Sequence, residues 1–116
     1  MAGMEEEGIR VNWRAALVPP AGARPIHGRV AWVGKQEVMV KAEHHLPPGQ
    51  VCHLALMLPK LKIDASNQFI EGQCVVTSSV LSGHHFFIKL QWQKIAGQGH
   101  ALLDERTHHY RRMWHC

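Results

Sequence analysis

The sequence of 116 residues contains few cysteines and no long apolar segment. Its three cysteines, Cys52, Cys74 and Cys116, include no Cys-x-x-Cys pair, which argues against a disulfide framework and a structural zinc site. No apolar run approaches the roughly 20 residues that cross a bilayer, and the N-terminus is acidic where a signal peptide would be basic. We therefore predict a cytoplasmic protein with reduced thiols and no membrane insertion.

Motifs for catalysis are also absent from the sequence. It contains neither a Gly-x-Gly-x-x-Gly segment nor a P-loop, its serines lie in no nucleophile elbow, and no pair of carboxylates stands out. Adjacent histidines such as His44-His45 and His84-His85 would point to opposite faces of a strand, so both rings could not bind one ion. We predict no enzyme, no catalytic residue, no metal site and no cofactor.

The composition describes one globular domain with a basic surface. Hydrophobic residues make up 46% of the chain, charged residues make up 19%, and the formal net charge is +4. A basic surface favours anionic partners such as nucleotides, nucleic acid or acidic proteins, but a surplus of this size selects none of them. Non-specific nucleic-acid binding would rest on net charge alone, so nucleic acid is not the expected partner.

Apolar residues alternate with polar residues in short runs, and this period of two is typical of strands. Turn-forming residues separate the runs, which predicts a mainly β, compact barrel over about 9–95, preceded by a disordered lead over 1–8. After about 98 the apolar spacing becomes helical, which predicts a C-terminal helix over about 98–114 and one domain over 9–116. The alternating runs are Ile26, Val30 and Trp32; Val38, Val40 and Ala42; Cys52, Leu54, Leu56 and Leu58; Ile70, Cys74 and Val76; and Phe86, Ile88, Leu90 and Trp92.

Two arginines at the start of the folded part are the first candidate ligand-binding residues. Arg10 and Arg14 share parity, so in an extended chain they would project to one side about 13 Å apart, and a local turn would bring them closer. A guanidinium group binds phosphate or the O6/N7 edge of guanine in a bidentate manner. The alternative interpretation is a pair of surface arginines with no ligand.

Several segments share their order and composition with one family of bacterial domains: Arg-x-x-x-Arg at 10–14, Gly-Arg-Val-Ala at 28–31, Leu-Pro-Pro-Gly-Gln at 46–50, and the strand segments 54–59, 72–76 and 87–90. With these segments, the sequence resembles the PilZ domain family, which comprises receptors for cyclic di-GMP. The resemblance extends over about 10–112. It implies a six-stranded antiparallel β-barrel with a C-terminal α-helix, in agreement with the periodicity.

The second motif of the PilZ family is missing. That motif, Asp or Asn followed by x-Ser-x-x-Gly, aligns with Trp32, Gly34 and Glu37, none of which matches. In the family its first two side chains bind a guanine, whereas Trp32 offers only an indole donor and Gly34 has no hydroxyl. Losing two such hydrogen bonds would weaken binding by a factor of roughly ten to several thousand. The segment 64–69 imitates the motif, but we interpret it as an ordinary turn.

The resemblance implies a PilZ-type regulatory domain that binds cyclic di-GMP and relays it to control of motility, pili, surface polysaccharide or virulence. Its partner would be a bacterial signalling or pilus-assembly protein. Arg10 and Arg14 would hold phosphates and guanine, Trp32 would stack on a purine, and Lys35 together with Arg24 would add phosphate contacts.

Two alternatives stay open at this point. Trp32 continues the parity of Ile26 and Val30, which favours a place inside the barrel over a place in the ligand site. The whole domain could also be a degenerate PilZ adaptor that has lost the nucleotide and acts by protein contact. Its contact surface would then lie near Trp13, Trp114 and the C-terminal helix.

Overall fold

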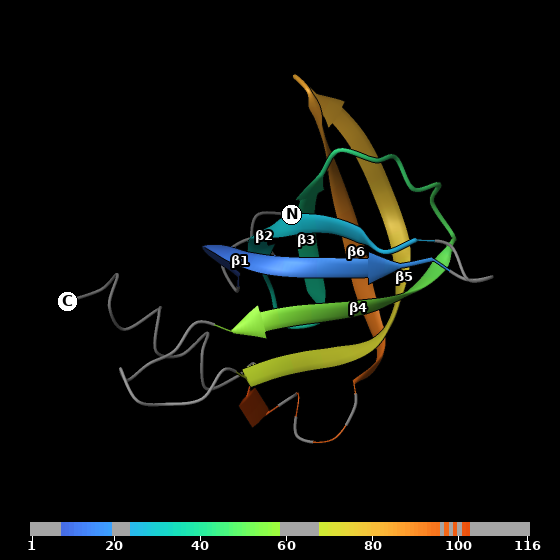
Figure 1. Cartoon of the computed structure of the whole chain (residues 1–116). Coiled ribbons are helices and arrows are strands. Elements are labelled where there is room, and N and C mark those ends of the chain that lie inside the picture. Colours follow the sequence, from blue (N-terminus) through green and yellow to red (C-terminus); the bar gives the residue numbers. More distant parts are fainter. Residues whose placement is uncertain are drawn as a thin grey trace.

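The computed structural model describes residues 8–19, 24–58, 68–95, 97, 99, 101 and 102. Six antiparallel strands form a closed barrel in the order β1-β2-β3-β6-β5-β4 (Figure 1). This confirms the predicted six-stranded antiparallel barrel. The strands are β1 (Ile9–Val18), β2 (Ile26–Val33), β3 (Glu37–Ala42), β4 (Val51–Leu58), β5 (Gln68–Ser82) and β6 (His85–Ile95).

The barrel consists of two meanders, each made of three consecutive strands. Strands β1, β2 and β3 pair in sequence order, and so do β4, β5 and β6. Two non-local pairings then join the meanders, β3 with β6 and β1 with β4. The segment 43–50 connects the two meanders along the chain.

Some sequence predictions fall outside the described residues. The predicted C-terminal helix over 98–114 is among them, apart from Gly99, Ala101 and Leu102, whose backbone is helical. The predicted lead over 1–8 is described only at Gly8, and the segment 64–69 only at its last two residues, which begin β5. No helix in the described part of the chain is long and apolar enough to cross a membrane.

Alternating residues of all six strands fill the barrel interior. Leu17, Leu54 and Leu56 are completely buried, as are Ile88 and Leu90. Each such side chain contributes roughly 1.5–3 kcal/mol through removal of apolar surface from water. The period-two pattern in the sequence therefore identified Leu54, Leu56, Ile88 and Leu90 as core residues, but its runs did not include Leu17.

Two buried cysteines lie opposite each other in this core. Cys52 of β4 pairs with Cys74 of β5, and both thiols are free. Burial raises the pKa of both thiols, and for Cys74 the neighbouring Cys52 raises the pKa further. Both residues are small apolar core residues, as their alternating positions predicted.

A β-bulge in β2 overturns the prediction that Trp32 points into the barrel. Val30 pairs with Val40, but Trp32 pairs with Met39, so the register shifts by one residue between them. An extra residue in one strand moves every later side chain to the other face. The inward position passes to Val33, which is completely buried, and Trp32 is only half-buried.

Trp13 differs from its predicted role in the adaptor alternative. Its side chain is only 4% exposed and belongs to the core, so it offers no contact surface. Trp114, the other tryptophan named for that surface, lies outside the described residues.

The β5–β6 hairpin is longer than its apolar pattern predicted and extends past the end of the barrel (Figure 1). Strand β5 has 15 residues, whereas its alternating run ended at Val76. The last pair of the hairpin is Ser82 with His85, and Gly83 makes the turn with a φ of 65°. Such a left-handed conformation favours glycine because it has no Cβ.

Candidate ligand-binding face of the barrel

Three cationic side chains lie next to one another across three adjacent strands. Arg14 of β1 is paired with Arg29 of β2, and Arg29 is in turn paired with Lys41 of β3. All three residues are exposed. Side chains directly opposite each other in an antiparallel sheet share one face, with Cβ atoms about 4.5–5.5 Å apart. We call Arg14, Arg29 and Lys41 the basic ladder.

The basic ladder has no carboxylate partner in the described part of the chain. The ion pairs there join His53 to Glu71 and Lys89 to Glu37, and neither includes a ladder residue. Like charges directly opposite each other are unfavourable in an antiparallel pair. A bound anion with more than one negative charge would remove this repulsion, so the face is suited to a phosphate-containing ligand.

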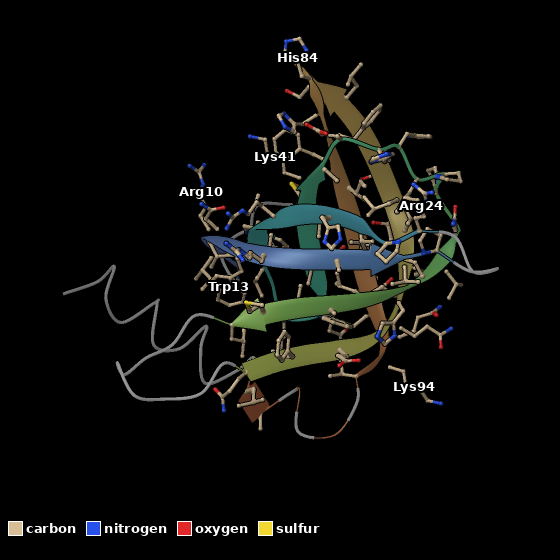
Figure 2. The ribbon with its side chains drawn as sticks, in the orientation of Figure 1. Arg10, Trp13, Arg24, Lys41, His84 and Lys94 are labelled. Atoms are coloured by element: carbon tan, nitrogen blue, oxygen red, sulfur yellow. The ribbon has the colours of Figure 1, made fainter. Side chains whose placement is uncertain are left out.

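Arg10 and Trp32 extend the basic ladder toward one end of the barrel. They are paired directly across β1 and β2, with Arg10 exposed and Trp32 half-buried on the outer face. Figure 2 shows Arg10 projecting from the N-terminal end of β1. A register shift between Arg10 and Trp13 interrupts the regular extended spacing from Arg10 to Arg14. The structure thus places a cation and an aromatic ring together beside the ladder.

The Trp32 indole packs against the backbone of two glycines. A Cβ added at Gly8 would overlap the indole at its Cζ2, Cε2 and Nε1 atoms, and a Cβ added at Gly34 would overlap its six-membered ring at Cη2 and Cζ3. Gly34 aligns with the serine of the PilZ motif, so two departures from that motif are physically linked. A glycine at 34 leaves the space that a tryptophan at 32 occupies.

Glu37, the third departure from the motif, also has a local role. Its backbone oxygen accepts a hydrogen bond of 2.8 Å from the Gly34 amide, which closes the turn between β2 and β3. Its carboxylate lies 3.6 Å from the Lys89 Nζ atom on β6. The turn therefore keeps a tight geometry although it lacks the glycine of the motif at 37.

The remaining predicted cations lie in two different places. Lys35 is exposed in the β2–β3 turn, at the same end of the barrel as Arg10. Arg24 is exposed just before β2, and Figure 2 shows it at the opposite end of β1 from Arg10. The structure brings Lys35 near Arg10 and Trp32, but it does not bring Arg24 there.

Arg29 and Lys41 were missed as candidate residues. Both were visible in the sequence as outward-facing positions of the two strands that flank the short turn at 34–36. Their alignment with Arg14 depends on strand register, which apolar periodicity does not determine where a bulge intervenes. A regular hairpin continued from the Val33–Val38 pair would place Arg29 opposite Ala42, so simple pairing of the two strands gives no signal for this alignment.

Together, the strand order and closure define a six-stranded antiparallel β-barrel, the architecture that the resemblance to the PilZ family implied. A solved structure with this fold is the Inhibitor of motility (MotI/DgrA) of Bacillus subtilis, which is 15% identical in sequence and superposes with a TM-score of 0.75. The similarity covers 93% of this chain and 50% of that one, so this chain spans about half the length of the solved structure. No family model and no curated protein matches the sequence.

Proposed function

We propose that this chain is a PilZ-type regulatory domain that binds cyclic di-GMP on the basic ladder and relays it to the control of motility. The observation that carries the proposal is the alignment of Arg14, Arg29 and Lys41 across three strands, beside Arg10 and Trp32. The PilZ-like fold supports it, since the structurally similar Bacillus subtilis protein is an inhibitor of motility.

The chemistry of the ligand fits the arrangement of these side chains. A cyclic dinucleotide carries two phosphates, and adjacent strands are about 4.8 Å apart, so the ladder offers cationic groups over a width of about 10 Å. Guanidinium groups bind phosphate oxygens in pairs and also stack on bases. Arg10 and the exposed part of Trp32 flank the ladder where a purine would lie.

Because the second motif is missing, this site lacks the side chains that hydrogen-bond a guanine in the PilZ family. Trp32 and Gly34 supply no side-chain acceptor for a guanine edge, and the Glu37 carboxylate is paired with Lys89. Affinity therefore comes mainly from charge and stacking, and we expect it to fall as the salt concentration rises. We expect weaker binding than in PilZ domains that retain both motifs.

Calorimetric titration of cyclic di-GMP into the full chain tests the proposal. We expect saturable binding that Arg14→Ala and Arg29→Ala each weaken by at least about tenfold, since charge-assisted hydrogen bonds contribute about 1.5–3 kcal/mol. Arg24→Ala is the matched control, because Arg24 is an exposed arginine at the other end of the barrel. A flat titration with folded protein would overturn the proposal and favour the adaptor alternative, as would equal affinities of all three variants and the wild type.

A further inference from the structure

The projecting part of the β5–β6 hairpin has a free backbone edge. Strand β4 pairs with β5 only as far as Val75, and the next contact on that side is Val76, whose N–H donates to Gln50 and whose carbonyl accepts from Gly49. From 78 to 82, β5 pairs with β6 on one side, and no described strand pairs with the other side of 77–82. Alternate N–H and C=O groups of this edge therefore point outward without a strand partner.

The side chains along this edge are apolar or neutral. Val80 is 59% exposed and Leu81 is 60% exposed, although both are large hydrophobic residues. The segment 77–82 reads Thr-Ser-Ser-Val-Leu-Ser and contains no charge and no proline. Exposed strand edges in natural proteins usually carry a lysine, a proline or another feature that prevents pairing. The bulge between Val76 and Ser78 bends the strand, but five residues of edge follow it.

One side chain of the connection between the two meanders, His45, contacts the projecting hairpin. The His45 Nδ1 atom lies 3.0 Å from the Ser79 Oγ atom, within hydrogen-bonding distance. The imidazole also packs on Phe86 of β6, with the ring centroids 5.4 Å apart. Both are contacts between side chains, and among the described residues the backbone hydrogen bonds from the 43–50 connection to β5 end at Val76.

We propose that this edge is a self-association surface, on which 77–82 of one copy pairs antiparallel with 77–82 of a second copy. Antiparallel pairing about a twofold axis places a segment opposite itself in reverse order, so a charge near the middle of the segment would lie beside the same charge of the other copy. The neutral segment 77–82 avoids that repulsion in a chain whose formal net charge is +4. An acidic peptide attracted to the basic chain would find no cation on this segment.

The proposed pairing has two structural consequences. A twofold pairing uses the same edge in both copies, so it ends at a dimer and does not grow into a fibre. In the outward-facing cross-strand row, Phe87 and Val80 lie between Lys41 and the free edge, so the basic ladder stays open in the dimer. The contact is a single strand pair, smaller than a standard interface, and we expect weak, reversible association.

Analytical ultracentrifugation of the full chain over micromolar to millimolar concentrations tests this inference. We expect a reversible monomer–dimer equilibrium that Val80→Lys and Leu81→Lys each weaken by at least tenfold. The matched control is Phe69→Lys, because Phe69 is 53% exposed on the same strand but lies in its paired part, opposite Met57. Circular dichroism establishes that each variant is folded.

Four results of this experiment would contradict the proposal. A single species of monomer mass at every concentration overturns the proposal and leaves the edge available to a strand of another protein. Assemblies larger than a dimer, or a dimer that neither Val80→Lys nor Leu81→Lys weakens, overturn it as well. An equal loss of dimer in Phe69→Lys would place the contact elsewhere on the barrel and contradict the assignment to 77–82.

Discussion

Arg14 and Arg29 lie directly opposite each other on the outer face of the β1–β2 pair, and Lys41 continues the row on β3. In the described residues no carboxylate forms an ion pair with any of the three. Like charges directly opposite each other in an antiparallel pair repel, so this row is a local cost to the folded state. The same row is the feature of the barrel best suited to hold an anion.

Neutralising the central cation of the basic ladder should stabilise the free protein. We expect Arg29→Gln to raise the free energy of unfolding by about 0.2–0.5 kcal/mol at low salt. Added salt screens the repulsion, so the gain should disappear at high salt. Urea unfolding at both salt concentrations measures it. Arg24→Gln should give no gain, and an equal gain for Arg29→Gln at both salt concentrations would show that repulsion is not its cause.

The barrel interior should be far more sensitive to truncation than its surface. Leu56 is completely buried, and we expect Leu56→Ala to lower the free energy of unfolding by about 2–5 kcal/mol. Phe69→Ala removes a larger side chain that is 53% exposed, and we expect it to cost about 1 kcal/mol or less. Chemical denaturation measures both, and a larger loss for Phe69→Ala would contradict the burial of Leu56 and the exposure of Phe69.

The packing of Trp32 on Gly34 should appear as an energetic coupling. Gly34 does not have a positive φ, so alanine is tolerated by its backbone, but the added methyl group would meet the Trp32 indole. We expect Gly34→Ala to cost about 1–3 kcal/mol in the wild type and little in a Trp32→Ala background. A double-mutant cycle from urea unfolding measures the coupling. The same cost in both backgrounds would mean that the methyl group meets something other than Trp32.

The buried thiols should make the protein less stable at alkaline pH. Burial raises the pKa of Cys52 and Cys74 in the folded state, whereas unfolded thiols titrate near their ordinary value of 9.0. Above that pH the folded protein keeps protons that the unfolded chain releases, so the free energy of unfolding falls as pH rises. Well below the pKa of the unfolded thiols, both states are protonated, and the thiols make no pH-dependent contribution to the free energy of unfolding.

The expected slope is about 1.4 kcal/mol per pH unit for each thiol above its unfolded pKa. Unfolding in urea between about pH 8 and about pH 10 measures it for the wild type and for a variant with Cys52→Ala and Cys74→Ala. The variant has a lower stability but should show a shallower decline. Identical slopes would show that the two thiols do not govern the stability in the alkaline range.

The sequence predicted much of this fold because each strand buries one face. Alternation identified the inward residues of β3 and β4 correctly, and Cys52 and Cys74 were placed in the core. Alternation failed at Trp32, because the bulge that follows Val30 changes parity and involves neither glycine nor proline. The end of β5 was missed because its serines continue the strand beyond the core, where no apolar face is required.

The candidate site was predictable only in part. Arg10 and Arg14 stood out by their spacing, which is a local property of the sequence. Arg29 and Lys41 join them through strand pairing, and that register depends on bulges in β1 and β2 that have no marker in the sequence. The link between Trp32 and Gly34 likewise depends on ring packing across the turn.

The construction of the barrel from two meanders bears on how the chain folds during synthesis. The β1–β2–β3 meander has only local pairings and can form early. The free edges of β1 and β3 can pair only after β4 and β6 have been synthesised. Arg14 pairs with Met57, and Val40 pairs with Ile88. Each pairing that closes the barrel therefore joins residues far apart in the sequence. Non-local pairing of this kind is slow because loop-closure entropy is lost before the contacts form. We expect joining of the two halves, and not hairpin formation, to limit the folding rate.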